Sequence, residues 1–310
     1  MSLPRVALCF PGQGSQATHM ADGLLHLPST RQLLDVAAGE GLDLAAALRG
    51  DDEALRPTEV AQPALVLVET VLSEELRGLE VVAVAGHSVG EYSAVVAAAG
   101  LDAATAMRLV AARGRAMAAM REGGMLALLG ADPAAAQAIC AAVEEGGETV
   151  VIANFNGPGQ VVLSGTRAGI AAAADIASAH GVRRAIALRV SGAFHSPLMA
   201  DAAASFARLL DDAPLVTPRV PVVCNVDGQA VSDIDGLRDR LRRQLESPVR
   251  WSDCVATLAG LGIDALVEVG PGAVLTGLAR RIVPTMEAFA IATVDEAHAA
   301  GERVIAVAHG

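Results

Sequence analysis

The chain has 310 residues, 53% of them hydrophobic, so it is long enough to bury a large core in one domain or two. Its formal net charge is −12 and all 23 basic residues are arginine, which argues against nucleic acid as a partner. The lack of lysine in the sequence also excludes Schiff-base chemistry and a Walker-type phosphate loop, since both need that side chain.

The cysteines and the N-terminal sequence predict a cytoplasmic protein. The N-terminus has no charged leader before a long apolar region, and no apolar run reaches membrane-spanning length, so no membrane partner is expected. Cys9, Cys140, Cys224 and Cys254 are widely spaced and lack the paired spacing of metal ligands. We therefore expect free thiols in a reducing compartment, no metal site and no permanently bound cofactor.

The first predicted strand covers Leu3–Phe10 and leads into a glycine-rich turn. Gly12-x-Gly14-x-x-Ala17 imitates a dinucleotide-binding fingerprint, but Pro11 separates the strand from the first glycine. No second strand ends in an acidic residue at the expected distance, which makes nucleotide binding the minor interpretation. We instead expect this turn to supply amides to a site beside it, since the carboxyl ends of parallel strands share one edge of a sheet.

A nucleophile-elbow pattern follows the second strong strand signal. The apolar run at residues 81–85 stops at Gly86, and an alanine-rich helical segment begins just after Ser88. In Gly86-x-Ser88-x-Gly90 the glycines permit a crowded turn that holds the serine hydroxyl above the sheet. The free amides of the following helix point at the same place. The pattern predicts that Ser88 attacks a carbonyl.

Two helical patterns beside the elbow carry polar residues toward the core. Pro63 suits the first turn of a helix, which places Gln62 at a helix entrance. A second helix is expected from Ala103 to Met120, with Arg113 alone on one flank of its apolar face. An isolated arginine on a buried flank needs an anion. A salt bridge to a surface carboxylate is the alternative role.

The pattern changes between residues 124 and 189, where strands and helices follow the order β-α-β-β-α-β. We expect strands at 125–129, 149–154, 160–164 and 184–188 and helices at 133–145 and 167–180, with a hairpin loop at 154–160. This order is typical of a ferredoxin-like unit. The sequence therefore predicts an α/β fold in which a small subdomain, 124–189, is inserted into a large domain formed by 1–123 and 190–310.

The candidate base lies where the chain returns from this insert. His195 stands in a loop between Val190 and Met199, whereas most of the other histidines sit in polar or terminal settings. His87 adjoins the nucleophile, but neighbours along a chain at a turn usually point apart. We therefore expect His195 to serve Ser88, with further strands and helices in the remainder of the chain completing the core.

Seven motifs in this order resemble those of the malonyl-CoA:acyl carrier protein transacylases and of the related acyltransferase domains of polyketide synthases. They are Phe10-Pro11-Gly12-Gln13-Gly14-Ser15-Gln16, Gln62-Pro63-Ala64, Gly86-His87-Ser88-Val89-Gly90-Glu91-Tyr92, Arg113-Gly114-Arg115, Asn154-Phe155-Asn156-Gly157-Pro158-Gly159-Gln160, Gly192-Ala193-Phe194-His195-Ser196 and Glu268-Val269-Gly270-Pro271-Gly272. The resemblance extends from about residue 6 to residue 282. It implies a hydrolase-like parallel-sheet domain with a ferredoxin-like α+β insert.

The resemblance also implies roles for the reacting groups. Ser88 would be the nucleophile that carries the acyl group, and His195 the base that takes its proton and returns one to each leaving thiol. The backbone amides of Gln13 and Val89 would form the oxyanion hole.

Further residues would select the acyl group or orient the base. Arg113 would bind the free carboxylate of malonate with Gln62 close by, and Phe194 would leave no space for an α-methyl branch. A backbone carbonyl near Gln244, together with Asn225, would orient the histidine in place of an aspartate.

The implied activity is transfer of a malonyl group from coenzyme A to the phosphopantetheine thiol of an acyl carrier protein, with ping-pong kinetics, for fatty acid or polyketide synthesis. Malonyl-CoA would be a substrate, and the phosphopantetheine would belong to the partner. A serine esterase or thioesterase would share the nucleophile and base but would not need Arg113. The malonyl transferase subunit of a malonate decarboxylase would share every site residue, and a non-enzymatic carrier-binding module would not need Ser88.

Overall fold

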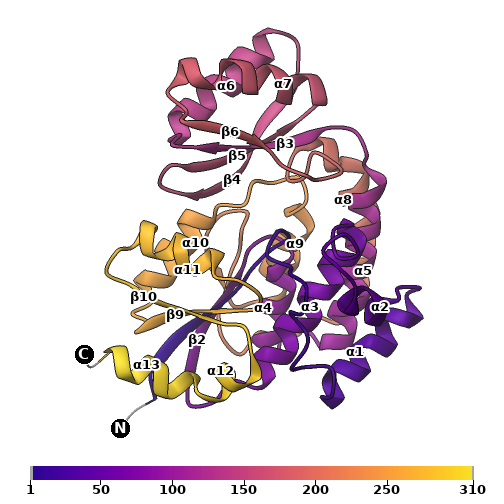
Figure 1. The fold of residues 1–310 in the computed structure, drawn as a ribbon, viewed down its shortest axis with the longest axis vertical. Helices are drawn as coiled ribbons and strands as arrows, with labels where there is room; N and C mark the ends of the chain where they lie inside the picture. Colours follow the sequence, from indigo (N-terminus) through magenta and orange to yellow (C-terminus); the bar gives the residue numbers. More distant parts are fainter. Residues whose placement is uncertain (1–2, 309–310) are drawn as a thin grey trace.

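A computed structural model describes residues 3–308, which fold into two sheets flanked by helices (Figure 1). The larger sheet has six strands in the order β10-β9-β1-β2-β7-β8. Their bounds are β1 Arg5–Phe10, β2 Glu80–Gly86, β7 Val222–Val223, β8 Ala230–Val231, β9 Ala265–Val269 and β10 Glu287–Ile291. All neighbouring pairs are parallel except β7 with β8. Within residues 3–308, no helix has the length and apolar character needed to cross a membrane.

Helices cover both faces of this sheet, so its central strands are largely apolar, apart from Arg5 and Glu80 at the strand starts and the buried Glu268 in β9. The helices are α1 Pro28–Gly39, α2 Leu44–Arg49, α3 Thr58–Glu74, α4 Gly90–Ala97, α5 Ala103–Ala119, α8 Ala200–Asp212, α9 Ile234–Arg243, α10 Trp251–Gly260, α11 Val274–Ile282, α12 Val294–His298 and α13 Ala300–Ala308. Alternate residues of β1 enter different cores, since Leu8 packs in the cluster with α3 and α5, and Cys9 in the cluster with α10 and α11.

The smaller sheet lies at the far end of the molecule from the termini (Figure 1) and is antiparallel, in the order β4-β5-β3-β6. Its elements are β3 Gly124–Leu129, α6 Pro133–Glu145, β4 Val150–Gly157, β5 Gln160–Gly165, α7 Arg167–Ile176, the 3-10 helix η1 Ala177–His180 and β6 Arg184–Ala187. The expected ferredoxin-like order is confirmed. We propose that residues 124–189 are a subdomain with its own core, formed by α6 and α7 against the sheet.

Two local predictions were wrong. The expected hairpin loop at 154–160 is mostly strand, because β4 continues to Gly157 and pairs on its outer edge with Val249 of the large body. The hydrogen bonds from Phe155 N to Val249 O (2.9 Å) and from Val249 N to Ala153 O (2.8 Å) satisfy that edge. This pairing ties the small sheet to the segment just before α10.

Helix α3 also begins earlier than expected. It begins at Thr58, so Pro63 lies inside the helix and Gln62 is on its second turn rather than at its entrance. A proline here removes one intrahelical hydrogen bond. Burial of residues 61–72 on a helix packed against α4 and α5 offsets that loss.

The two loops expected to meet do meet at the carboxyl edge of the large sheet. Phe10 is the register partner of Gly86, so the turn after β1 lies beside the elbow after β2. A Cβ on Gly12 would lie 2.6 Å from the carbonyl oxygen of His87, and one on Gly90 would lie 2.2 Å from the carbonyl oxygen of Phe10. Only glycine permits the two backbones to come this close.

We predict that Gly90→Ala destabilises the protein by about 1–3 kcal/mol or more, because the added methyl group overlaps rigid backbone of β1. The measurement is equilibrium denaturant unfolding. Gly277→Ala is the matched control, since Gly277 lies in α11 with no atom within 4 Å of a built Cβ. The control should be neutral or stabilising by about 0.5–1 kcal/mol. Equal stabilities for the two variants would contradict the close contact.

Candidate active site

Ser88 stands on a strained turn between β2 and α4. Its φ is +54°, in the left-handed region that residues other than glycine rarely adopt. Its backbone N–H donates to Asn225 Oδ1 at 2.7 Å, and Asn225 Nδ2 donates to the carbonyl of Gly86 at 2.7 Å. These two bonds brace the strained turn from both sides and hold the hydroxyl above the N-terminus of α4.

His195 is in contact with Ser88 although 107 residues separate them in sequence. Ser88 Oγ lies 2.7 Å from His195 Nε2, and Nδ1 faces the carbonyl oxygens of Gln244 at 3.0 Å and Ser247 at 3.1 Å. Because carbonyl oxygens only accept, Nδ1 carries the hydrogen and Nε2 is free to accept the serine proton. The structure thus places the expected carbonyl of Gln244 against the imidazole.

The side chain of Asn225 is not at the imidazole, where the sequence analysis expected it. Within the described chain its polar atoms contact the elbow backbone and the Cys254 thiol, and none reaches His195. The reason is geometric, since Asn225 follows β7, which pairs with β2 and therefore ends beside the elbow. Asn225 thus holds the turn that carries Ser88 and does not contact the imidazole of His195.

Burial controls the protonation state of the imidazole. His195 is 4% exposed, and desolvation, assisted by the nearby charge of Arg113, lowers its pKa to about 3. The ring is therefore neutral at neutral pH and able to accept a proton. His87, the other histidine near the elbow, is partly buried, and desolvation lowers its pKa. Its Nε2 lies 2.9 Å from Asn156 Oδ1 on β4.

Gln13 and Val89 both line a cavity of about 160 Å³ that contains Ser88 and His195. Neither backbone N–H donates a hydrogen bond to another group in the described residues. Gln13 is held by its side chain, whose Oε1 accepts from Thr58 Oγ1 at 2.6 Å. Two unpaired amides beside a serine hydroxyl are the donors that a developing oxyanion needs.

Arg113 is buried in the same cavity, with 1% of its surface exposed. Its guanidinium donates to Gln62 Oε1 at 2.6 Å, to Gln244 Oε1 at 2.9 Å and to Ser88 Oγ at 3.2 Å. No carboxylate in the described chain forms a salt bridge with it, and its Nε has no partner. The surface salt bridge considered for Arg113 is thus not formed, and its charge faces the cavity.

Apolar side chains form much of the remaining cavity wall, together with Asn154 and Asn156. Phe194 is 5% exposed and lies beside the base, and the other apolar lining residues are Met117, Met125, Val162, Leu188 and Val190. Four of these, Met125, Val162, Leu188 and Val190, come from the small sheet or its return segment, so the site lies where the two sheets meet. Within residues 3–308, no cluster of three or more His, Cys, Asp or Glu side chains could hold a metal ion.

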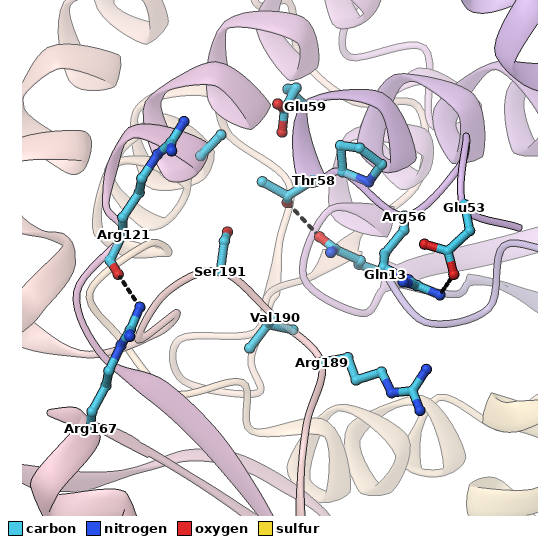
Figure 2. Close-up of a pocket in the computed structure, with 12 residues that line it drawn as sticks. Gln13, Glu53, Arg56, Thr58, Glu59, Arg121, Arg167, Arg189, Val190 and Ser191 are labelled. Carbon is cyan, nitrogen blue, oxygen red and sulfur yellow. Dashed lines mark hydrogen bonds and ion pairs between the residues drawn. The ribbon is translucent and has the colours of Figure 1, made fainter.

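A larger cavity of about 450 Å³ adjoins this one and shares Gln13 and Val190 with it. Figure 2 shows the residues that line this larger cavity. Four arginines line it, Arg56, Arg121, Arg167 and Arg189. Arg56 pairs with Glu53, whereas Arg189 has no ion-pair partner in the described chain. Glu59 also lines it, so four arginines and two glutamates give the lining a net positive charge beside the serine cavity.

Two groups of this site were not predicted from the sequence. The side chain of Gln244 contacts Arg113 and the carbonyl of Ser88, and Glu91 is 1% exposed beneath them. Glu91 could have been found, because an acidic residue stands out in an otherwise apolar segment, Gly90–Ala97. Gln244 had no comparable signal, since it follows a strongly charged helix on the surface.

Comparisons with known proteins identify the family. The model of the acyl transferase domain matches residues 8–301. The malonyl CoA-acyl carrier protein transacylase of Escherichia coli (strain K12) is 41% identical over 298 residues, which cover 93% of this chain and 96% of the relative. The chain belongs to the malonyl-CoA:acyl carrier protein transacylase family.

Solved structures of this transacylase family have the same fold. The crystal structure of the malonyl-CoA:acyl carrier protein transacylase from Xanthomonas oryzae pv. oryzae has a TM-score of 0.91 at 38% identity, covering 98% of this chain and 99% of that one. A malonyl-transacylase in complex with its type II polyketide synthase acyl-carrier protein has a TM-score of 0.90 at 37% identity, covering 96% and 99%.

The low pKa of His195 gives a testable pH dependence. The rate at which phenylmethylsulfonyl fluoride modifies Ser88, followed by intact mass, should stay level from about pH 8 to about pH 5, because the imidazole stays neutral over that range. His195→Ala should slow the reaction at every pH. A loss of rate centred near pH 6.5, the ordinary value for histidine, would contradict the assignment.

Proposed function

We propose that this protein transfers a malonyl group from coenzyme A to the phosphopantetheine thiol of an acyl carrier protein through a malonyl-Ser88 intermediate. The observation that carries the proposal is the position of Arg113. Its buried guanidinium lies 3.2 Å from Ser88 Oγ and has no carboxylate partner in the described chain. An acyl group bound to Ser88 would be placed to offer its own carboxylate there. The names and the bound carrier protein of the relatives support the same activity.

Acylation follows from the geometry of Ser88 and His195. His195 Nε2 takes the Oγ proton as Oγ attacks the thioester carbonyl, and the amides of Gln13 and Val89 stabilise the oxyanion. Collapse of the tetrahedral intermediate breaks the carbon–sulfur bond, and the imidazolium returns its proton to the coenzyme A thiolate. A positioned base is worth about 10²- to 10⁴-fold in rate, and an oxyanion donor about 10²- to 10³-fold.

The second half-reaction repeats these steps with a different thiol. His195 deprotonates the phosphopantetheine thiol, which attacks malonyl-Ser88, and the same two amides stabilise the second oxyanion. The imidazolium then protonates Ser88 Oγ as it leaves. Because both thiols use one serine in turn, the kinetics are ping-pong.

Arg113 selects the acyl group. A guanidinium can hold a carboxylate through two parallel hydrogen bonds, and such charge-assisted pairs are among the stronger ones. Gln62 and Gln244 keep the guanidinium near Ser88, and the ring of Phe194 supplies the wall that leaves no space for an α-methyl branch.

The arginine-lined cavity beside the site suits the phosphate groups of the two thiol carriers. Arg189 and its neighbours line a space of about 450 Å³ that adjoins the serine cavity. The activity needs no permanently bound cofactor or metal, because the nucleophile Ser88 and the base His195 both belong to the protein. We also propose a cytoplasmic location, which agrees with the four free cysteines.

Incubation with malonyl-CoA followed by intact-mass measurement tests the intermediate. We expect the wild-type protein to gain the mass of one malonyl group and Ser88→Ala to gain none. The adduct should persist in water and disappear when a phosphopantetheine-carrying acyl carrier protein is added. Rapid loss of the adduct in buffer alone would instead favour a thioesterase, and malonylation of Ser88→Ala would exclude Ser88 as the nucleophile.

Arg113→Ala should reverse the acyl preference. Loss of the guanidinium removes a buried charge-assisted contact, so kcat/KM for malonyl-CoA should fall by about 10²-fold or more, whereas acetyl-CoA should be used no worse. The measurement is competition between the two thioesters, read by mass. Unchanged malonyl selectivity would contradict the role of Arg113.

A further inference from the structure

Glu91 is a buried carboxylate with two defined donors. It lies on the first turn of α4, and its Oε1 accepts from the backbone N–H of Asn225 at 2.9 Å. Its Oε2 accepts a hydrogen bond from Gln244 Nε2. In the described chain it forms no ion pair with Arg113 and does not reach Ser88 Oγ. None of the steps derived above uses it.

The orientation of the Gln244 side-chain amide determines whether its oxygen or its nitrogen faces Arg113. Its Oε1 accepts from Arg113 Nη2 at 2.9 Å, and its Nε2 donates to the carbonyl of Ser88 at 2.9 Å and to Glu91. A side-chain amide can turn over and exchange its oxygen and nitrogen with little change in shape. If Gln244 turned over, its NH₂ would face the donors of Arg113, and that contact would be lost.

We propose that Glu91 is a positioning residue for the acyl-carboxylate site: by accepting from Gln244 Nε2 it fixes the amide orientation that holds Arg113 beside Ser88. The proposal rests on the function proposed above. Glu91 thereby acts on the acyl selectivity of the enzyme, and it does so without contact to the substrate.

The two donors require an acceptor at both oxygens of residue 91. The backbone N–H of Asn225 cannot turn, so it always needs one acceptor, and Gln244 needs the other. A glutamine at position 91 has one oxygen and must place its NH₂ against one of these donors. The carbonyl of Ser88 still accepts from Gln244, so the expected effect is smaller than that of removing Arg113.

The charges around Glu91 give the site a pH dependence. Burial raises the pKa of Glu91 to about 7, against the lowering effects of the bonds from Gln244 and Asn225 and of the charge on Arg113. The other titratable groups facing it are Tyr92, Cys224 and Cys254, and burial raises the pKa of each. Below about pH 7 Glu91 gains a proton, and one of its acceptors becomes a donor, as in a glutamine.

Glu91→Gln tests the proposal, with Glu91→Asp as the matched variant that keeps two acceptor oxygens. Rates of Ser88 acylation by malonyl-CoA and by acetyl-CoA are measured in the full-length protein. For Glu91→Gln we expect kcat/KM for malonyl-CoA to fall about tenfold, mainly through KM, and that for acetyl-CoA to change less than about threefold. Glu91→Asp should recover part of the malonyl preference.

An equal fall for both thioesters would overturn the proposal, since it would mean that Glu91 acts only through Asn225 and the elbow. An unchanged ratio of the two kcat/KM values, malonyl-CoA to acetyl-CoA, would also overturn the proposal. If Glu91→Gln fails to fold, the wild-type protein tests the proposal. Its ratio of kcat/KM for malonyl-CoA to kcat/KM for acetyl-CoA should fall as the pH is lowered from about 8 to about 6, and a constant ratio refutes the proposal. Malonylation of wild-type Ser88 tests the proposed function independently of either result.

Discussion

The site depends on a buried positive charge that the protein leaves without a counter-charge in direct contact. Arg113 is held by the amide oxygens of Gln62 and Gln244 and lies 5.8 Å from the ring centroid of Tyr92. Taking a guanidinium out of water costs several kcal/mol, and neutral acceptors offset only part of that cost. In the function proposed above, the carboxylate of the acyl group completes the compensation. The cost of burying Arg113 would then be recovered as affinity for an acyl group with a free acid.

Ser88 and His195 contact each other without an acidic third residue. The strained φ of Ser88 is stabilised by Asn225 on one side and by close glycine packing against β1 on the other. His195 is oriented by two backbone carbonyls, which fix its tautomer without adding a negative charge. With Arg113 nearby and water excluded, the imidazole remains neutral and ready to accept a proton.

The two sheets contribute different parts of this site. The large sheet positions Ser88, because the carboxyl ends of β1, β2 and β7 meet at one edge, whereas His195 lies in the loop that follows the small sheet. The small sheet supplies apolar walls and the Asn156 that binds His87, and its edge strand pairs with Val249. Val249 lies two residues after Ser247, whose carbonyl faces His195. The placement of the small sheet is thus coupled through a short segment to the orientation of the base.

The sequence by itself determined the elements whose signals are local. Periodicity and paired glycines predicted the strand, turn and helix around Ser88 and the order of the insert, and a set of motifs pointed to Ser88, His195 and Arg113, which the structure brings together. Only the tertiary structure decided the contacts of Asn225, the role of the Gln244 side chain and the burial of Glu91. These three features depend on how segments more than 100 residues apart in sequence pack around the elbow. Hydrophobic periodicity and local propensity carry no information about such contacts.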